Sequence, residues 1–314
     1  MYRFQLPLTL VIPRERTWMR SSAPMMGTTA EVLIDGDASM VRAAFAKLRY
    51  LESILTRFRP DSDLNRLHAH PGEWVRVNAE LFNAFVWSDR MYRETRGLFD
   101  PTIRDALESS GYSSSFSQVV DDDRALDPPV PAPGFDKVNL DRATQSIRIA
   151  PGVSVDLGGV GKGLCADLVA RDLVAHGVGS AYVSLGGDIY AAGEPPETGF
   201  WQVPLVHPVS KEVIAEHHLV SGGLVMSTVS MRAWQRGGET VHHIIDPRSG
   251  CSTTTDVIAV AVAARSAARA EALAKAAIIL GADNGAAFLA TCDVTAWVIT
   301  GNDIVVVEEV SCSQ

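Results

Sequence analysis

The sequence has few of the features that mark membrane, nucleic-acid-binding or disulfide-rich proteins. Its four cysteines form no C-x-x-C pair and share no spacing, which argues against a metal cluster or a disulfide framework. Acidic residues outnumber basic ones by 37 to 28, and the net charge of −9 disfavours a nucleic-acid partner. No apolar run approaches the length of a membrane span. What remains is a globular protein with reduced thiols, for which we expect a cytoplasmic location.

The N-terminus also lacks the pattern of a secretion signal. Pro7 and Pro13 interrupt the apolar run at residues 6–12, no small-residue cleavage site follows, and the charged residues 14–16 come too soon. We therefore predict an N-terminal extension over residues 1–24 and one folded domain over residues 25–314.

Apolar spacing along the chain predicts helices and strands in mixed order. Helical spacing indicates helices over 41–55, 79–96 and 266–280, with short helices after the capping residue Ser62 and at Pro101. Strands are expected at 30–34, 137–140, 146–149, 181–185, 200–206, 218–220, 224–227, 242–245 and 257–263, and in a hairpin over 296–307. The mixed order favours an α+β fold. Residues 112–136, rich in Ser, Asp and Pro, predict a solvated loop and a boundary between two subdomains.

The densest glycine cluster lies in the segment 155–163. The β-branched run 153–155 predicts a strand, four glycines then surround Lys162, and a helical pattern follows as far as Gly177. A strand, a glycine turn and a helix N-terminus with a lysine together favour an anion site. The segment matches neither the Walker A loop nor the G-x-G-x-x-G fingerprint. A tight turn without a ligand fits it equally well.

Other polar candidates have ordinary explanations when each is taken alone. His243 precedes an Asp-Pro turn and could be a structural hydrogen-bond donor. Glu271 and Lys275 lie four residues apart and could form a surface ion pair. Asp100 could be a helix cap, and Phe58 a core aromatic residue. The residues alone therefore indicate an α+β enzyme or binding protein with a turn suited to an anionic ligand.

Six short blocks stand out along the chain. They are residues 26–28 (MGT), 55–64 (LTRFRPDSDL), 97–102 (GLFDPT), 155–163 (VDLGGVGKG), 183–188 (VSLGGD) and 243–250 (HIIDPRSG). Each block alone is a weak signal, but their shared order is specific. Taken in this order, they resemble the ApbE-type FAD:protein FMN transferase family, and the match runs from about residue 25 to 285.

This resemblance implies an α+β fold of two mixed subdomains with FAD between them. It also implies that FMN passes from FAD to a Ser or Thr hydroxyl of an acceptor protein, that AMP is released, and that Mg²⁺ takes part. His243 matches the catalytic base, and the Gly159 carbonyl matches a metal ligand. The positions that match FAD contacts are Met26, Phe58, Leu98, Phe99, Asp100, Asp156, Lys162 and Ile245.

Two positions depart from the family pattern. Where the family's metal-binding helix carries an Asp and, four residues later, a Thr, this chain has Glu271 and Lys275, with Ala274 before the lysine. Glu271 can still ligate Mg²⁺, but an ammonium in the threonine position repels a divalent ion. A Ser-Gly-x-Tyr run before an arginine is replaced by residues 228–231 (TVSM) before Arg232. Two other functions therefore stay open beside FMN transfer. The chain could be an FAD pyrophosphatase, or an FAD-binding protein without transferase activity.

Overall fold

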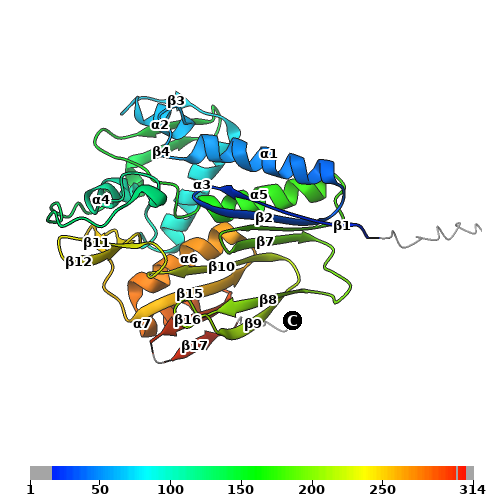
Figure 1. Cartoon of the computed structure of the whole chain (residues 1–314). Helices are drawn as coiled ribbons and strands as arrows, with labels where there is room; N and C mark the ends of the chain where they lie inside the picture. The colour runs from blue at the N-terminus through cyan, green and yellow to red at the C-terminus, as the bar shows by residue number, and fades with distance from the viewer. Residues whose placement is uncertain (1–15, 302, 309–314) are drawn as a thin grey trace, which may run out of the picture.

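The computed structural model describes residues 16–301 and 303–308, which build a large antiparallel sheet with helices on one side (Figure 1). The sheet has eight strands in the order β1-β2-β6-β7-β10-β15-β16-β17, and every neighbouring pair is antiparallel. Its strands are β1 (Trp18–Met25), β2 (Thr28–Asp35), β6 (Ser180–Leu185), β7 (Asp188–Gly193), β10 (Gly222–Thr228), β15 (Val257–Ala264), β16 (Thr295–Thr300) and β17 (Ile304–Val307).

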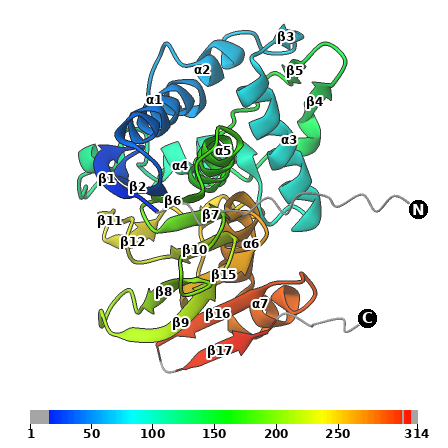
Figure 2. The same cartoon turned by 90° about the vertical axis from the view of Figure 1, so that its right-hand side faces the viewer.

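One face of this sheet is covered by helices (Figure 2). α5 (Gly161–Ala175) and α6 (Ala267–Leu280) lie side by side on it, α1 (Ala38–Leu55) packs on α5, and α3 (Ala79–Glu94) contacts α6. α7 (Ala282–Leu289) follows α6 and packs against β16 and β17. The main hydrophobic core fills the space between the sheet and these helices.

The opposite face is covered by the hairpin of β8 (Trp201–Val206) and β9 (Val213–Leu219). Side chains of β15 point alternately to the two faces of the sheet, so this strand contributes to both hydrophobic cores. Val260 and Val262 belong to the core beneath the helices, whereas Ala261 and Ala263 belong to the core beneath the hairpin. This burial on both faces explains the continuous apolar run that predicted the strand.

The remaining elements surround one end of the helical layer. α2 (Asp63–His68) precedes a small sheet of β3 (Val75–Arg76), β5 (Ser146–Ile149) and β4 (Val138–Asp141). Two 3-10 turns, η2 (Phe116–Gln118) and η3 (Phe135–Lys137), lie within or at the end of the predicted boundary loop 112–136. η1 (Pro101–Ile103) and α4 (Arg104–Ser109) pack with the hairpin of β11 (Ala233–Arg236) and β12 (Glu239–His242), followed by β13 (Ile245–Asp246) and β14 (Cys251–Ser252).

Three sequence predictions of local structure are wrong. The predicted extension reaches too far, because residues 18–24 form most of β1, which pairs with β2 along its whole length. Residues 153–155 form no strand. The strand expected at 242–245 is broken, since β12 ends at His242 and β13 begins at Ile245, which leaves His243 in the connection. Residues 1–15 of the predicted extension, and Asn302 of the predicted hairpin, lie outside the described residues.

Among the residues that the structure describes, no helix is long and apolar enough to cross a membrane. The three cysteines in this part, Cys165, Cys251 and Cys292, are free thiols.

Candidate functional site

A cavity of about 340 Å³ opens where the end of α1, the start of α5 and the β11–β14 region meet. It collects residues from all parts of the chain. Of the residues predicted to form the site, it is lined by Met26, Phe58, Leu98, Phe99, Asp100, Asp156, Gly159, Lys162, His243 and Ile245. Lys275 lines it as well, while Glu271 is fully buried behind Lys162 and Lys275.

Met26 reaches the cavity because the β1–β2 hairpin turns tightly there. Met25 pairs with Thr28, and the two residues between them, Met26 and Gly27, both have positive φ, at 53° and 65°. Positive φ at both central residues is typical of a two-residue hairpin turn. A positive φ is unusual for a methionine. The Met26 N–H donates to a carboxylate oxygen of Glu52 on α1 at 2.7 Å, which holds the turn against the helix.

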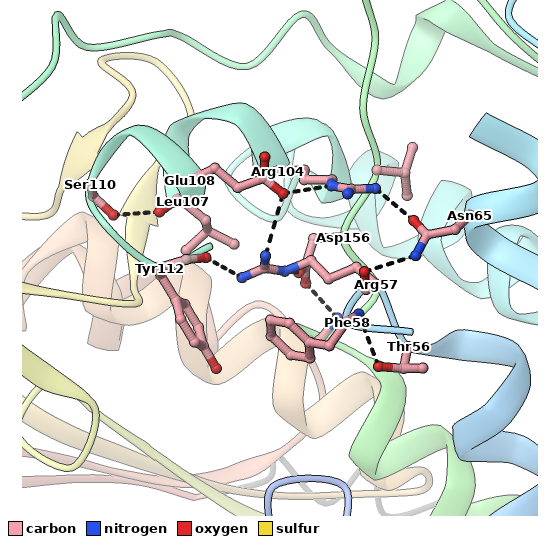
Figure 3. Close-up of polar contacts among 12 residues, drawn as sticks. Thr56, Arg57, Phe58, Asn65, Arg104, Leu107, Glu108, Ser110, Tyr112 and Asp156 are labelled. Carbon is pink, nitrogen blue, oxygen red and sulfur yellow. Dashed lines mark hydrogen bonds and ion pairs between the residues drawn. The ribbon is translucent and has the colours of Figure 1, made fainter. Parts of the chain in front are cut away.

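Arg57 organises the wall of the cavity beyond the end of α1 (Figure 3). Its guanidinium is buried, donates to the Tyr112 carbonyl at 2.5 Å and lies 3.4 Å from a carboxylate oxygen of Glu108. Its Nε lies 2.5 Å from Asp156 Oδ2. The same guanidinium lies over the rings of Phe58 and Tyr112, at 4.2 and 4.9 Å from their centroids. Arg57 therefore positions both an aromatic wall and the acid of the glycine segment.

Phe58 is 41% exposed, so it is not the core aromatic of the ordinary explanation. An exposed ring in a cavity wall, held by a cation on one side, suits a planar aromatic ligand.

Asp100 does have the capping role of its ordinary explanation. Its buried carboxylate accepts from the backbone and the hydroxyl of Thr102, at 2.8 and 2.7 Å, so it caps η1 as well as lining the cavity. Burial raises the pKa of Asp100, although the bonds from Thr102 oppose this.

The glycines of the segment 155–163 permit close approach rather than unusual backbone conformations. None of Gly158, Gly159, Gly161 and Gly163 has a positive φ. A Cβ at Gly159 would lie 2.9 Å from the Phe99 ring, and one at Gly163 would lie 2.5 Å from the backbone of Ala267. Gly163 therefore lets α5 and α6 touch. Gly161 differs from both, because a Cβ there would meet no atom within 4 Å.

The start of α5 offers fewer free N–H donors than the sequence suggested. The Gly161 N–H donates to the Leu157 carbonyl at 2.7 Å, and the Gly163 N–H donates to Glu271 Oε2 at 3.0 Å. Two of the donors expected to face an anion thus have protein acceptors.

Lys162 belongs to a charged cluster that we define as Lys162, Asp188, Glu271 and Lys275. Its ammonium contacts the Asp188 carboxylate and lies 2.7 Å from Glu271 Oε1. Burial raises the pKa of Asp188 to about 6, partly opposed by Lys162. Burial also disfavours a charged Glu271, but Lys162 and Lys275 outweigh it and lower the pKa of Glu271 to about 2. At neutral pH both carboxylates are ionised and neutralised by ammonium groups.

Lys275 completes the cluster on the cavity side. Its Nζ lies 3.1 Å from Glu271 Oε1 and 3.1 Å from the carbonyl oxygen of Gly159. The pair is thus not the surface ion pair of the ordinary explanation, because Glu271 is fully buried and the Lys275 side chain is 14% exposed. Burial lowers the pKa of Lys275, and the charge of Glu271 opposes that shift.

The cluster does not fit a divalent metal ion. The residues that would hold one are the Gly159 carbonyl and Glu271, and both already contact the Lys275 ammonium. The described part of the chain contains no group of three or more His, Cys, Asp or Glu residues placed to hold a metal. Mg²⁺ prefers six oxygen ligands in octahedral geometry, and an ammonium among them would repel it.

His243 lines the cavity in the connection between β12 and β13. Its backbone N–H donates to the Arg232 carbonyl at 3.2 Å, and its buried Nδ1 has no hydrogen-bond partner among the described residues. His243 is half-buried and borders the cavity. Burial, and then the charges of Arg232 and Lys275, lower the pKa of His243 well below its ordinary value. The imidazole is therefore neutral at pH 7 and can accept a proton.

The neighbouring His242 has a structural role. Its Nδ1 accepts from the Ile244 N–H at 3.2 Å, and its Nε2 lies 3.1 Å from the Thr253 carbonyl oxygen, to which it donates. The same tautomer satisfies both contacts.

Sequence reasoning assigned no site role to Arg57, Tyr112 or Asp188. All three contribute to the site through long-range contacts: Arg57 and Tyr112 line the cavity, and Asp188 pairs with Lys162 from the start of β7. Arg232 also lines the cavity, with its guanidinium 3.4 Å from the Tyr112 hydroxyl and no carboxylate partner among the described residues. The preceding Val229 has no positive φ, so the β-branched residue fits there without strain.

Known proteins share both the sequence pattern and the fold. The model of the ApbE family matches residues 26–298. An FAD:protein FMN transferase of Treponema pallidum (strain Nichols) is 29% identical over 299 residues, covering 88% of this chain and 82% of the relative. One from Vibrio cholerae serotype O1 is 25% identical over 276 residues, covering 85% of this chain and 82% of the relative.

Solved structures agree in fold. The ApbE protein of Thermotoga maritima superposes with a TM-score of 0.83 at 22% identity, covering 93% of this chain and 97% of that chain. The flavinyl transferase ApbE of Pseudomonas stutzeri superposes with a TM-score of 0.78 at 23% identity, covering 94% and 96%. The α+β fold expected from the sequence is confirmed.

Proposed function

The chain belongs to the ApbE family, and we propose on that basis that it is an FAD:protein FMN transferase. It moves FMN from FAD to a Ser or Thr hydroxyl of an acceptor protein and releases AMP. The relatives from Treponema pallidum and Vibrio cholerae carry this activity in their names. A cytoplasmic location, expected from composition, stays a prediction.

One observation carries the proposal. A single cavity gathers Met26, Phe58, Phe99, Asp156 and His243, which come from five separate sequence blocks. Structural packing alone does not require that blocks so far apart in the chain face one open space. An aromatic wall at Phe58 suits the isoalloxazine ring, and the lysines and Arg232 suit the phosphates. We infer that FAD occupies this cavity.

His243 is the residue suited to activate the acceptor hydroxyl. The hydroxyl oxygen attacks the phosphorus of the FMN half, the bond from this phosphorus to the bridging oxygen breaks, and AMP leaves with the electron pair. His243 takes the hydroxyl proton, because its imidazole is neutral and faces the cavity. Positive groups around the phosphates stabilise the charge that develops on them.

Product analysis tests the proposal. The full chain is incubated with FAD and a purified flavin-acceptor protein, and the products are identified by chromatography and mass spectrometry. AMP together with FMN bound covalently to a Ser or Thr of the acceptor is the expected result. Free FMN plus AMP would instead identify an FAD pyrophosphatase, and intact FAD bound to the chain would identify a flavin-binding protein.

A further inference from the structure

Lys275 occupies the place of a cation at the glycine segment. Its ammonium lies between the Gly159 carbonyl and the Glu271 carboxylate, 3.1 Å from an oxygen of each. A bound metal ion would have to use these same two oxygens. The ammonium also lines the cavity, so its positive charge is presented to whatever the cavity holds.

Both carboxylate oxygens of Glu271 already accept hydrogen bonds from the protein. Its Oε1 accepts from both Lys162 and Lys275, at 2.7 and 3.1 Å, and its Oε2 accepts from the Gly163 N–H at 3.0 Å. All of these donors come from the protein itself. The side chain is fully buried, so a metal ion would have to displace an ammonium to reach it.

The charge of the cluster is balanced without a metal ion. Two ammonium groups, Lys162 and Lys275, face two carboxylates, Asp188 and Glu271. Before FAD binds, adding a divalent ion would leave two uncompensated positive charges in a buried site, which is costly. Without Lys275 the cluster would carry one net negative charge, and a divalent ion would then be favoured only if residue 275 offered it an oxygen ligand, as Thr does and Met does not.

We propose that the Lys275 ammonium replaces the divalent metal ion in this chain, so that FAD binding and FMN transfer need no Mg²⁺. This inference rests on the proposed function and names the cation that meets the FAD phosphates. Lys275 supplies one fixed positive charge from α6, and Arg232 faces the same cavity from another element.

Binding of FAD to the metal-stripped full chain tests the inference apart from transfer activity. FAD is titrated by calorimetry in EDTA and in Mg²⁺, for the native sequence and for three variants. Lys275→Met keeps the length of the side chain but removes its charge. Glu271→Asp with Lys275→Thr restores the family pattern. Lys47→Met removes a lysine that pairs with Glu80 between α1 and α3; neither residue lines the cavity, and this variant serves as the matched control.

The native chain and Lys47→Met are expected to bind FAD equally in EDTA and in Mg²⁺. Lys275→Met is expected to bind FAD about tenfold or more weakly in both, which is the scale of one lost charge-assisted hydrogen bond. The double variant is expected to bind weakly in EDTA and to regain affinity in Mg²⁺. Circular dichroism confirms that each variant is folded, and if Lys275→Met unfolds, the EDTA comparison on the native chain decides alone.

Two results would overturn the inference. Native FAD affinity that falls in EDTA and returns with Mg²⁺ would show that a metal ion is needed, and would leave the proposed function intact. A native chain that binds no FAD in either condition would contradict the proposed function as well.

Discussion

Lys275 on α6 donates to the Gly159 carbonyl at 3.1 Å and so ties the glycine segment to the helix that runs beside α5. The contact joins two segments that are far apart in the sequence. It is made by the residue that departs most from the family pattern. The contact between the glycine segment and α6 is therefore made by a lysine where the family pattern has a threonine, and this lysine adds a positive charge to the cavity wall.

Removing the other lysine of the cluster should cost stability. Lys162→Met leaves Asp188 and Glu271 buried with only the Lys275 ammonium to neutralise them. We expect a loss of about 3–5 kcal/mol in the free energy of unfolding, the range for breaking a buried ion pair from one side. Urea unfolding measures it. The control Lys47→Met breaks a more exposed pair and should change this free energy by about 1 kcal/mol or less.

His243→Ala should separate chemistry from binding. We expect FAD affinity to stay nearly the same and turnover to fall by about 10²–10⁴-fold, the usual contribution of a general base. His242→Ala is the informative comparison, because its ring bridges the Ile244 N–H and the Thr253 carbonyl. It should lower the melting temperature more than His243→Ala does. If His243→Ala unfolds the protein and His242→Ala does not, the base assignment loses its support.

The pH dependence of the reaction follows from the lowered pKa of His243. The neutral imidazole is the active form, so activity is lost as pH falls through the pKa of the folded protein. Since burial and neighbouring charges place that pKa well below 6.5, kcat/KM should still be close to its maximum at pH 6.5. A profile of kcat/KM against pH measures this. Half-maximal activity at or above pH 6.5 on the acid side would argue for another base.

Two glycines of the same segment should respond differently to alanine. At Gly163 a Cβ would lie 2.5 Å from the Ala267 carbonyl carbon, so Gly163→Ala should force α5 and α6 apart and cost about 1–3 kcal/mol of stability. At Gly161 a Cβ meets no atom within 4 Å and the position lies in a helix, so Gly161→Ala should leave stability equal or higher. Thermal unfolding of both variants makes the comparison, and equal losses would contradict it.

Local sequence signals predicted most of the fold, and the family resemblance named many of the residues that line the cavity, but neither predicted the contacts between them. The helix over 79–96 was found because its apolar spacing is regular, and the strand over 257–263 was found because it is a continuous apolar run. β1 was missed because Pro24 and Ser21 weaken its pattern, and such residues are tolerated in a strand at the edge of the sheet. β7 was missed because it follows directly on two glycines, at residues 186 and 187.

The site was harder to predict than the fold. Lys162 was expected to hold an anionic ligand, yet its partners Asp188 and Glu271 come from distant parts of the chain that no local pattern links to it. The glycines around it were expected to form part of an anion site, whereas the structure uses Gly159 and Gly163 for close packing at Phe99 and Ala267. Spacing on a helix did predict that Glu271 and Lys275 share a face.

The most direct test of the account measures two products of one reaction together. With FAD, a flavin-acceptor protein and EDTA, the amount of AMP released is compared with the amount of FMN bound covalently to the acceptor, for the native chain and for His243→Ala. We predict equal amounts of the two products from the native chain and far slower formation of both from the variant. AMP accompanied by an equal amount of free FMN, or FAD left intact both in EDTA and in a parallel reaction with Mg²⁺, would contradict the assignment as an FMN transferase.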